Sequence, residues 1–334
     1  MAETTGDRTG LFLASRDDPD LVREAESLGF ESVWAGEGQG TSAFGKLERW
    51  AVATDEIGLA TGIVDVYSRS PATVAQSVAT LDAHSGGRAI LGLGVAHPGV
   101  VGDFHGMDFD RPLARLAEYV ELIRRYLSGE RGAFDGDFFS PTRTSFWEAF
   151  EPERAEIPIY NAALGPKNVR LTGELADGWL PNFYPDSRFD SALDRLETGL
   201  ARSDRDRSAV DVAMYVLTAV HENESTARQA AAEHVAYYCR EIPGYYTRVA
   251  EAAGFGEEIA SIQAAGTDAA AAAAVTDELV DELALVGTAK DVRQGLADLR
   301  SRGVDIPIVR APAGSSEAWL ERTMAAAAPG REHT

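Results

Sequence analysis

His97 is the first candidate for proton chemistry, because it comes directly after the apolar run Ala89 to Ala96. Histidine changes charge near neutral pH, so it can donate a proton in catalysis. The alternative is a structural histidine that caps the following loop. His84 and His105 lie near it in sequence, but the spacing of the three is not that of a metal-ligand set. We therefore expect no metal site.

The turn Leu164-Gly165-Pro166-Lys167 is the second candidate, and it follows the apolar run Ile157 to Ala162. Glycine lets the backbone approach an anion closely, and proline favours the first turn of a helix. Free N–H groups at a helix N-terminus bind phosphate well, and Lys167 would add positive charge. An ordinary strand-to-helix turn has the same residue pattern, so both interpretations stand at this point.

Both candidates need elements that bring them to one place, and eight short apolar runs recur along the chain. Several lack strict alternation, as parallel strands covered on both faces should. Segments with helical periodicity separate them, such as the helix that Ser70 and Pro71 open and the helix that Thr288 caps. The runs are 10–14, 32–35, 57–64, 89–96, 157–162, 178–182, 210–220 and 306–310.

Eight strand-helix units in a chain of this length predict an α/β fold, the TIM (β/α)8 barrel. We expect Leu93 and Val309 to point into one barrel core, and Val95, His97 and Gly165 to gather at its C-terminal mouth. Two gaps between runs are too long for plain loops. We interpret the whole chain, 1–334, as a single domain with helical insertions at about 97–156 and 221–287, after strands four and seven.

The composition excludes several classes of function. Acidic residues number 53 against 31 basic ones, for a formal net charge of −22. Such a surface disfavours nucleic acid and anionic membranes as partners. Only three basic residues are lysines, which favours a halophile's protein over a merely acidic proteome. The single cysteine, Cys239, excludes an internal disulfide, and the polar start and lack of a long apolar run indicate a cytoplasmic protein.

Several segments together resemble the bacterial-luciferase-like superfamily, and most closely its branch that uses the deazaflavin coenzyme F420, such as the methylenetetrahydromethanopterin reductases. Their order and spacing carry the resemblance, since each alone is only glycine and hydrophobic residues. They span residues 9 to 311. The segments are 28–34, 59–64 with 69–72, 85–94, 157–167 with 176–179, and 286–305. The resemblance implies a TIM barrel with a flavin or deazaflavin at its C-terminal mouth.

The resemblance also implies roles for particular residues. The peptide bond between Gly62 and Ile63 matches a non-proline cis bond that forms a bulge against the cofactor ring, and the alternative is a tight turn that ends the strand. The segment 163–167 matches backbone that carries the cofactor phosphate. The residues implied to bind the cofactor are Gly62, Ile63, Val64, Val95, Ala163, Leu164, Gly165, Pro166 and Lys167.

The sequence departs from the family at Gly36-Glu37, where many deazaflavin relatives carry an Asp-His pair. Glu37 falls at the histidine position and could act as an acid or base if burial raised its pKa. A solvated loop carboxylate is the alternative. In some relatives a glutamate at the place of His97 donates a proton, so His97 and Glu37 are the rival catalytic residues. Arg69 is a lower-ranked candidate at the border of the cofactor.

The resulting hypothesis is a coenzyme F420-dependent oxidoreductase that moves a hydride between the deazaflavin and a small organic substrate. The alternative is an FMN-dependent, luciferase-like monooxygenase with the same fold and much of the same phosphate site. A non-enzymatic flavoprotein of this fold is the third possibility. We expect a small-molecule substrate and a homodimer or a higher homo-oligomer.

Overall fold

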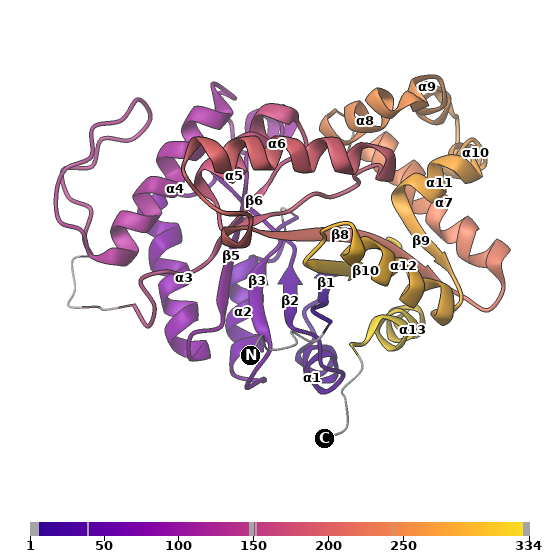
Figure 1. Ribbon diagram of the computed structural model, residues 1–334, viewed down its shortest axis with the longest axis horizontal. Coiled ribbons are helices and arrows are strands. Elements are labelled where there is room, and N and C mark those ends of the chain that lie inside the picture. Colours follow the sequence, from indigo (N-terminus) through magenta and orange to yellow (C-terminus); the bar gives the residue numbers. More distant parts are fainter. Residues whose placement is uncertain (1–6, 39, 147–149, 151, 243, 330–334) are drawn as a thin grey trace.

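Eight parallel strands close into a barrel in the computed structural model, which describes residues 7–38, 40–146, 150, 152–242 and 244–329 (Figure 1). The closure is the pairing of β10 with both β1 and β8. The predicted TIM barrel is thereby confirmed. In order around the barrel the strands are β1 (Gly10–Ala14), β2 (Ser32–Ala35), β3 (Gly58–Thr61), β5 (Ala89–Gly94), β6 (Ile159–Ala162), β7 (Gly178–Trp179), β8 (Asp211–Val220) and β10 (Ile306–Arg310).

Each of the eight apolar runs in the sequence contains one of these strands. The run 57–64 is divided at Gly62 and Ile63, because β3 ends at Thr61 and the short strand β4 (Val64–Asp65) then pairs with β5. A further strand, β9 (Ala284–Gly287), extends the sheet beside the C-terminal half of β8.

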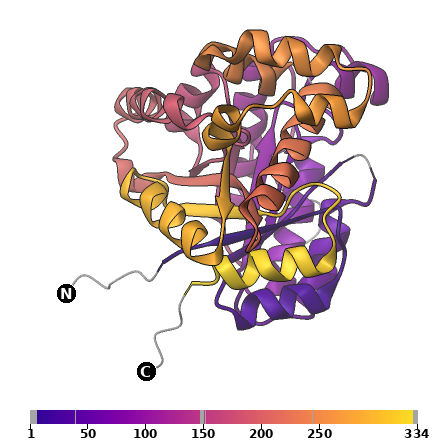
Figure 2. The same cartoon turned by 90° about the vertical axis from the view of Figure 1, so that its right-hand side faces the viewer.

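The helices form an outer layer around the strands, and several begin at a side-chain cap. Asp18 and Ser70 accept backbone N–H groups at the starts of α1 and α3, and Thr288 forms a capping box with Asp291 at α12. The outer helices are α1 (Pro19–Ser27), α2 (Ala43–Ala51), α3 (Pro71–Ser85), α4 (Pro112–Ser128), α5 (Pro166–Leu175), α6 (Phe189–Arg202), α12 (Ala289–Ser301) and α13 (Glu317–Ala327). Figure 2 shows the yellow α13 alongside the indigo α1.

A group of five helices between β8 and β9 stands to one side of the barrel, in orange in Figure 1. Alanines and other small residues of α7 pack against the neighbouring helices in a hydrophobic cluster that is separate from the large cluster of the barrel. No helix in the described part of the chain combines the length and apolarity that a membrane span requires. The five helices are α7 (Glu224–Glu241), α8 (Tyr245–Ala250), α9 (Gly256–Ala264), α10 (Asp268–Ala273) and α11 (Asp277–Leu283).

Strand alternation decides which side chains fill the barrel and which face the helices. Leu93 and Val309 belong to the large cluster between strands and helices, whereas Ile308 packs inside the barrel with Trp34 and Tyr215. The expectation that Leu93 and Val309 point into the barrel core is therefore wrong. Successive side chains of a strand point to opposite faces, so a residue next to an inward one must face outward.

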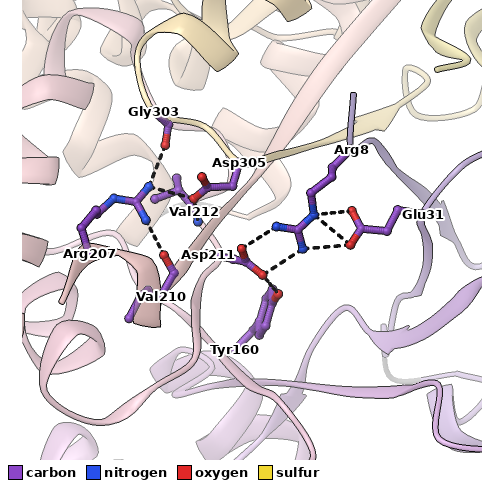
Figure 3. A network of polar contacts seen from close by, with 9 residues as sticks. All are labelled: Arg8, Glu31, Tyr160, Arg207, Val210, Asp211, Val212, Gly303 and Asp305. Carbon is purple, nitrogen blue, oxygen red and sulfur yellow. Dashed lines mark hydrogen bonds and ion pairs between the residues drawn. The ribbon is translucent and has the colours of Figure 1, made fainter. Parts of the chain in front are cut away.

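A polar network ties the strands together at their N-terminal ends (Figure 3). Arg8, before β1, donates to Glu31 at 2.8 Å and to Asp211 at 2.7 Å, and Asp211 also accepts the Tyr160 hydroxyl. Asp305, before β10, accepts the Val212 N–H at 2.7 Å. The network joins β1, β2, β6, β8 and β10, so it reinforces the closure of the barrel at the end opposite to the mouth.

Asp211 gives this network a predicted pH dependence. Its burial opposes ionisation, but hydrogen bonds from Arg8 and Tyr160 outweigh that effect and lower its pKa below the ordinary value. A carboxylate with a lowered folded pKa contributes stability above its unfolded pKa, and this stability disappears as the pH falls through the folded pKa.

We expect Asp211→Asn to lower the free energy of unfolding by about 1–3 kcal/mol at pH 7, the cost of weakening charged hydrogen bonds to a partly buried group. The deficit should shrink below about pH 4, where the unfolded carboxylate takes up a proton. Urea unfolding at a series of pH values measures it, with the exposed Glu222→Gln as control. A deficit that is the same at every pH would contradict the role of the charge.

Candidate functional site

The candidate residues gather at the C-terminal ends of adjacent strands. Gly94 of β5 is in register with Ala162 of β6, so His97 and Gly165, three residues further on, emerge at the same end of the barrel. Ala35 of β2 is likewise in register with Thr61 of β3, which brings Glu37 and Gly62 to that end. Active sites of TIM barrels lie at this face, so the strands position the candidates in one mouth.

The peptide bond between Gly62 and Ile63 is cis, as the resemblance implies. The Gly62 N–H donates to the Ala35 carbonyl at 2.8 Å, which fixes the bulge against β2. A Cβ added at Gly62 would lie 2.7 Å from the Tyr215 hydroxyl and 3.1 Å from the Phe12 ring. The backbone at Gly62 therefore approaches the barrel interior more closely than a side chain would allow.

The Ile63 side chain occupies room that two glycines of β5 leave open. A Cβ at Gly94 would lie 2.3 Å from Ile63 Cδ1, and a Cβ at Gly92 would lie 3.3 Å from Ile63 Cγ2 and 2.1 Å from the Thr61 carbonyl oxygen. These glycines face inward and make space for the bulge. Their spacing in the sequence thus reflects packing in this mouth.

The N-terminus of α5 is open at Gly165, its N-cap residue. No side-chain cap is present there, and a Cβ added at Gly165 would meet no atom within 4 Å. The Asn161 amide donates to Asn168 at 3.0 Å and to Thr172 at 2.8 Å, which anchors the first turns of α5 to β6. Lys167 is exposed in the first turn. This arrangement has the backbone access and the positive helix end that a phosphate group requires.

His97 is half-buried and begins the loop that leads into the π-helical turn Val100–Phe104. Its Nδ1 accepts the Val100 N–H at 3.4 Å. Since Nδ1 is the acceptor, this hydrogen-bond pattern assigns the proton of the neutral ring to Nε2. The side chain thus caps the loop through one nitrogen and keeps an N–H on the other.

Glu37 has an ion-pair partner at one carboxylate oxygen and a hydrogen-bond donor at the other. Oε1 lies 2.5 Å from Arg69 Nη1, and Oε2 accepts the Ala43 N–H at 2.8 Å at the start of α2. Glu37 is therefore neither an isolated acid nor a solvated loop residue, and its pair with Arg69 joins the loop after β2 to the segment before α3.

Lys46, in α2, also holds this loop in place, and it was not among the residues predicted from the sequence. Its ammonium donates to the Ala14 carbonyl at 2.9 Å and to the Gly36 carbonyl at 2.6 Å. Burial lowers its pKa, although Asp17 and Glu37 act in the opposite direction. The lysine thus fixes the ends of β1 and β2 relative to each other.

A second polar group in the mouth was also missed by sequence reasoning. Arg310 ends β10, its Nη1 donates to the Tyr238 hydroxyl, and its guanidinium lies 5.0 Å from the centre of the Phe12 ring. Asn182 donates to the hydroxyls of Tyr238 at 3.4 Å and Tyr246 at 3.3 Å. A charged residue at the end of an apolar strand was the available signal for Arg310. The tyrosines come from α7 and α8, and no spacing in the sequence connects them to it.

Comparison with known proteins agrees with this geometry. The family model described as luciferase-like monooxygenase matches residues 6–305. A Mycobacterium tuberculosis protein named as a coenzyme F420-dependent oxidoreductase is 32% identical over 317 residues, which cover 89% of this chain and 91% of the relative. The 5,10-methylenetetrahydromethanopterin reductase of Archaeoglobus fulgidus is 32% identical over 302 residues, 88% and 89% of the two chains.

The solved structure of the coenzyme F420-dependent tetrahydromethanopterin reductase from Methanopyrus kandleri has the same fold. It superimposes with a TM-score of 0.83 and 27% identity, over 97% of this chain and 98% of that one. The barrel, the matched family model and relatives similar over most of their length lead to one conclusion. The chain belongs to the luciferase-like monooxygenase family.

Proposed function

We propose that the protein is an oxidoreductase that transfers a hydride between coenzyme F420 and a small organic substrate. The observation that carries the proposal is the open N-terminus of α5 at Gly165, at the same end of the barrel as the bulge at Gly62 and Ile63. The first offers a phosphate site on backbone amides, and the second offers a surface against which a ring can rest. The Mycobacterium tuberculosis relative and the Methanopyrus kandleri structure, both of similar length and both named for F420, support the choice of coenzyme.

The described residues fit such a coenzyme. Gly165 has open space where a Cβ would be, so the backbone is accessible to an anionic group. The segment Ala163–Lys167 would hold the phosphate, and Gly62, Ile63, Val64 and Val95 would contact the ring. When bound, the deazaflavin accepts or supplies the hydride. The protein's own part is to orient the ring and to hold a proton at a suitable atom.

His97 is the proposed proton donor, through Nε2. Its Nδ1 lies 3.4 Å from the Val100 N–H, a long contact that orients the neutral ring. The proton donor is the imidazolium, which forms when Nδ1 takes up a proton and gives up this contact, and which then releases a proton from Nε2. Glu37 is assigned a positioning role, because Arg69 and the Ala43 N–H occupy its two oxygens.

The coenzyme itself is the first test. Protein produced in a deazaflavin-producing host should retain a chromophore that absorbs at the violet edge of the visible range, and exchange hydride with reduced F420. Retention of a chromophore that absorbs in the blue, as FMN does, would instead favour the monooxygenase alternative of this family. Assays are best run in concentrated salt, because the net charge of −22 is then screened.

Gly62→Ala should weaken coenzyme binding by at least about tenfold. The added methyl would lie 2.7 Å from the Tyr215 hydroxyl, so the bulge or the tyrosine must move to relieve the overlap. Titration of folded protein with F420, followed by absorption, measures the loss. The matched control is Gly256→Ala, where a Cβ meets no atom within 4 Å. If both variants bound F420 with equal affinity, Gly62 would not be part of the coenzyme site.

His97→Gln should lower kcat about 10²–10⁴-fold while the affinity for the coenzyme stays nearly constant, because a general acid acts in the transition state. Glutamine keeps a hydrogen-bonding side chain but cannot donate a proton in the same way. Glu37→Gln is the companion variant, and its main effect should be on stability of the loop after β2. If Glu37→Gln abolished turnover and His97→Gln did not, the two roles would be reversed.

A further inference from the structure

Arg310 is a buried cation without an anionic partner. It is 9% exposed, and within the described part of the chain no carboxylate oxygen lies within 4.0 Å of its guanidinium. Its Nε is buried and has no hydrogen-bond partner. Its neighbours are the rings of Phe12 and Tyr238. An uncompensated buried charge is costly to a folded protein, so its presence calls for an explanation.

Two other arginines show how this protein satisfies a guanidinium that serves the fold. Arg88, half-buried at the N-terminal end of β5, donates to the carbonyls of Ser85 at 2.7 Å, Ile57 at 2.7 Å and Thr54 at 2.9 Å. Arg154 pairs with the buried Asp82 at 2.6 Å. The chain has 53 acidic residues available as partners, yet it places none of the described ones against Arg310.

The surroundings of Arg310 add further groups that can donate hydrogen bonds, namely tyrosine hydroxyls and an asparagine amide. The Tyr215 hydroxyl is buried without a partner. The Tyr238 hydroxyl accepts from Arg310 and from Asn182, which leaves its own proton available. If the oxygen and nitrogen of the Asn182 amide were exchanged, Tyr238 and Tyr246 could donate to it, but Tyr215 and Arg310 Nε would remain unpaired.

This donor-rich group lies at the candidate coenzyme site. The Tyr215 hydroxyl is 2.7 Å from the place of a Cβ on Gly62, and Phe12 forms an edge-on contact with the Tyr215 ring at 5.2 Å. Phe12 and Ile63 are half-buried, so the group borders the part of the mouth that solvent reaches. The missing hydrogen-bond acceptor can therefore enter from the mouth.

We propose that Arg310 and Tyr215, supported by Tyr238, form a subsite for an anionic oxygen group, either a carboxylate of the substrate or the oxyanion edge of a heteroaromatic ring. The subsite deepens the proposed oxidoreductase function and rests on it. A guanidinium and a phenol supply the charge and the directed donors that such an oxygen group needs. The oxygen group supplies the acceptors that the described residues lack.

The first experiment measures the thermal stability of the coenzyme-free protein, where a structural and a binding arginine behave oppositely. Arg310→Met keeps much of the volume and removes the unpaired charge, so it should raise Tm by about 1–3 °C. Arg88→Met, the matched control, removes satisfied hydrogen bonds and should lower Tm. A fall for Arg310→Met as large as that for Arg88→Met would overturn the proposal.

The second experiment uses sodium benzoate as the probe, against sodium chloride at equal ionic strength. Benzoate should raise the Tm of the unaltered protein saturably and leave that of Arg310→Met unchanged. Tyr215→Phe should raise the half-saturating concentration about tenfold, the usual cost of one hydrogen bond to a charged group. Tyr126→Phe removes a hydroxyl that donates to the Arg143 carbonyl at 3.3 Å, and this variant should respond like the unaltered protein. The same benzoate response in Arg310→Met as in the unaltered protein would overturn the subsite.

Titration with F420 identifies the source of the oxygen group. A tenfold loss of F420 affinity in Arg310→Met would assign the group to the coenzyme ring, and unchanged affinity together with the lost benzoate response would assign it to the substrate. Either result supports the subsite. If neither the unaltered protein nor Arg310→Met bound F420 while benzoate binding still depended on Arg310, the proposed coenzyme would be wrong and the subsite would stand.

Discussion

The pairing of β8 with β10 is the contact on which the rest of this structure depends. It joins segments almost one hundred residues apart, in the register Ile306↔Ala213 to Arg310↔Leu217, and it converts an open parallel sheet into a closed one. A closed barrel has no free edge, and all strand C-termini point to one rim. Residues as distant in sequence as Gly62, Gly165 and Arg310 therefore share a mouth.

The two ends of the barrel divide stability and chemistry between them. At the N-terminal end, Arg8 is paired with two carboxylates, and Asp211 has donors from Arg8 and Tyr160. At the C-terminal end, Arg310 Nε and the Tyr215 hydroxyl have no hydrogen-bond partner. Such a division is typical of TIM barrels, in which residues at the N-terminal end of the barrel maintain the fold and residues at the C-terminal end determine the reaction.

The sequence predicts the architecture well, because apolar runs and caps are local signals. The strands, the helix starts at Ser70 and Thr288, and the open turn at Gly165 all follow from short stretches of residues. The direction of each side chain was harder to predict. Leu93 and Val309 are as apolar as inward residues, and only the register of the closed sheet decides which face they take.

The candidate site was predictable only in part, for a related reason. Glu37 was visible as a loop carboxylate, but its pairing with Arg69 depends on how the loop after β2 meets the start of α3. The neighbours of Arg310 come from β1 and from α7, a helix in the long segment before β9. Contacts of this kind arise from tertiary packing and leave no periodic pattern in the chain.

The packing of Ile63 against Gly92 and Gly94 couples three positions on neighbouring strands. A Cβ at Gly94 would fall 2.3 Å from Ile63 Cδ1, so the Ile63 side chain fills the space that the missing side chain of Gly94 leaves on β5. Interiors are packed too densely to absorb a methyl group at such a contact without movement. In a lineage of such proteins these positions can change only together. A larger residue on β5 must be accompanied by a smaller one at the bulge, and the shape of the mouth is thereby inherited as a unit.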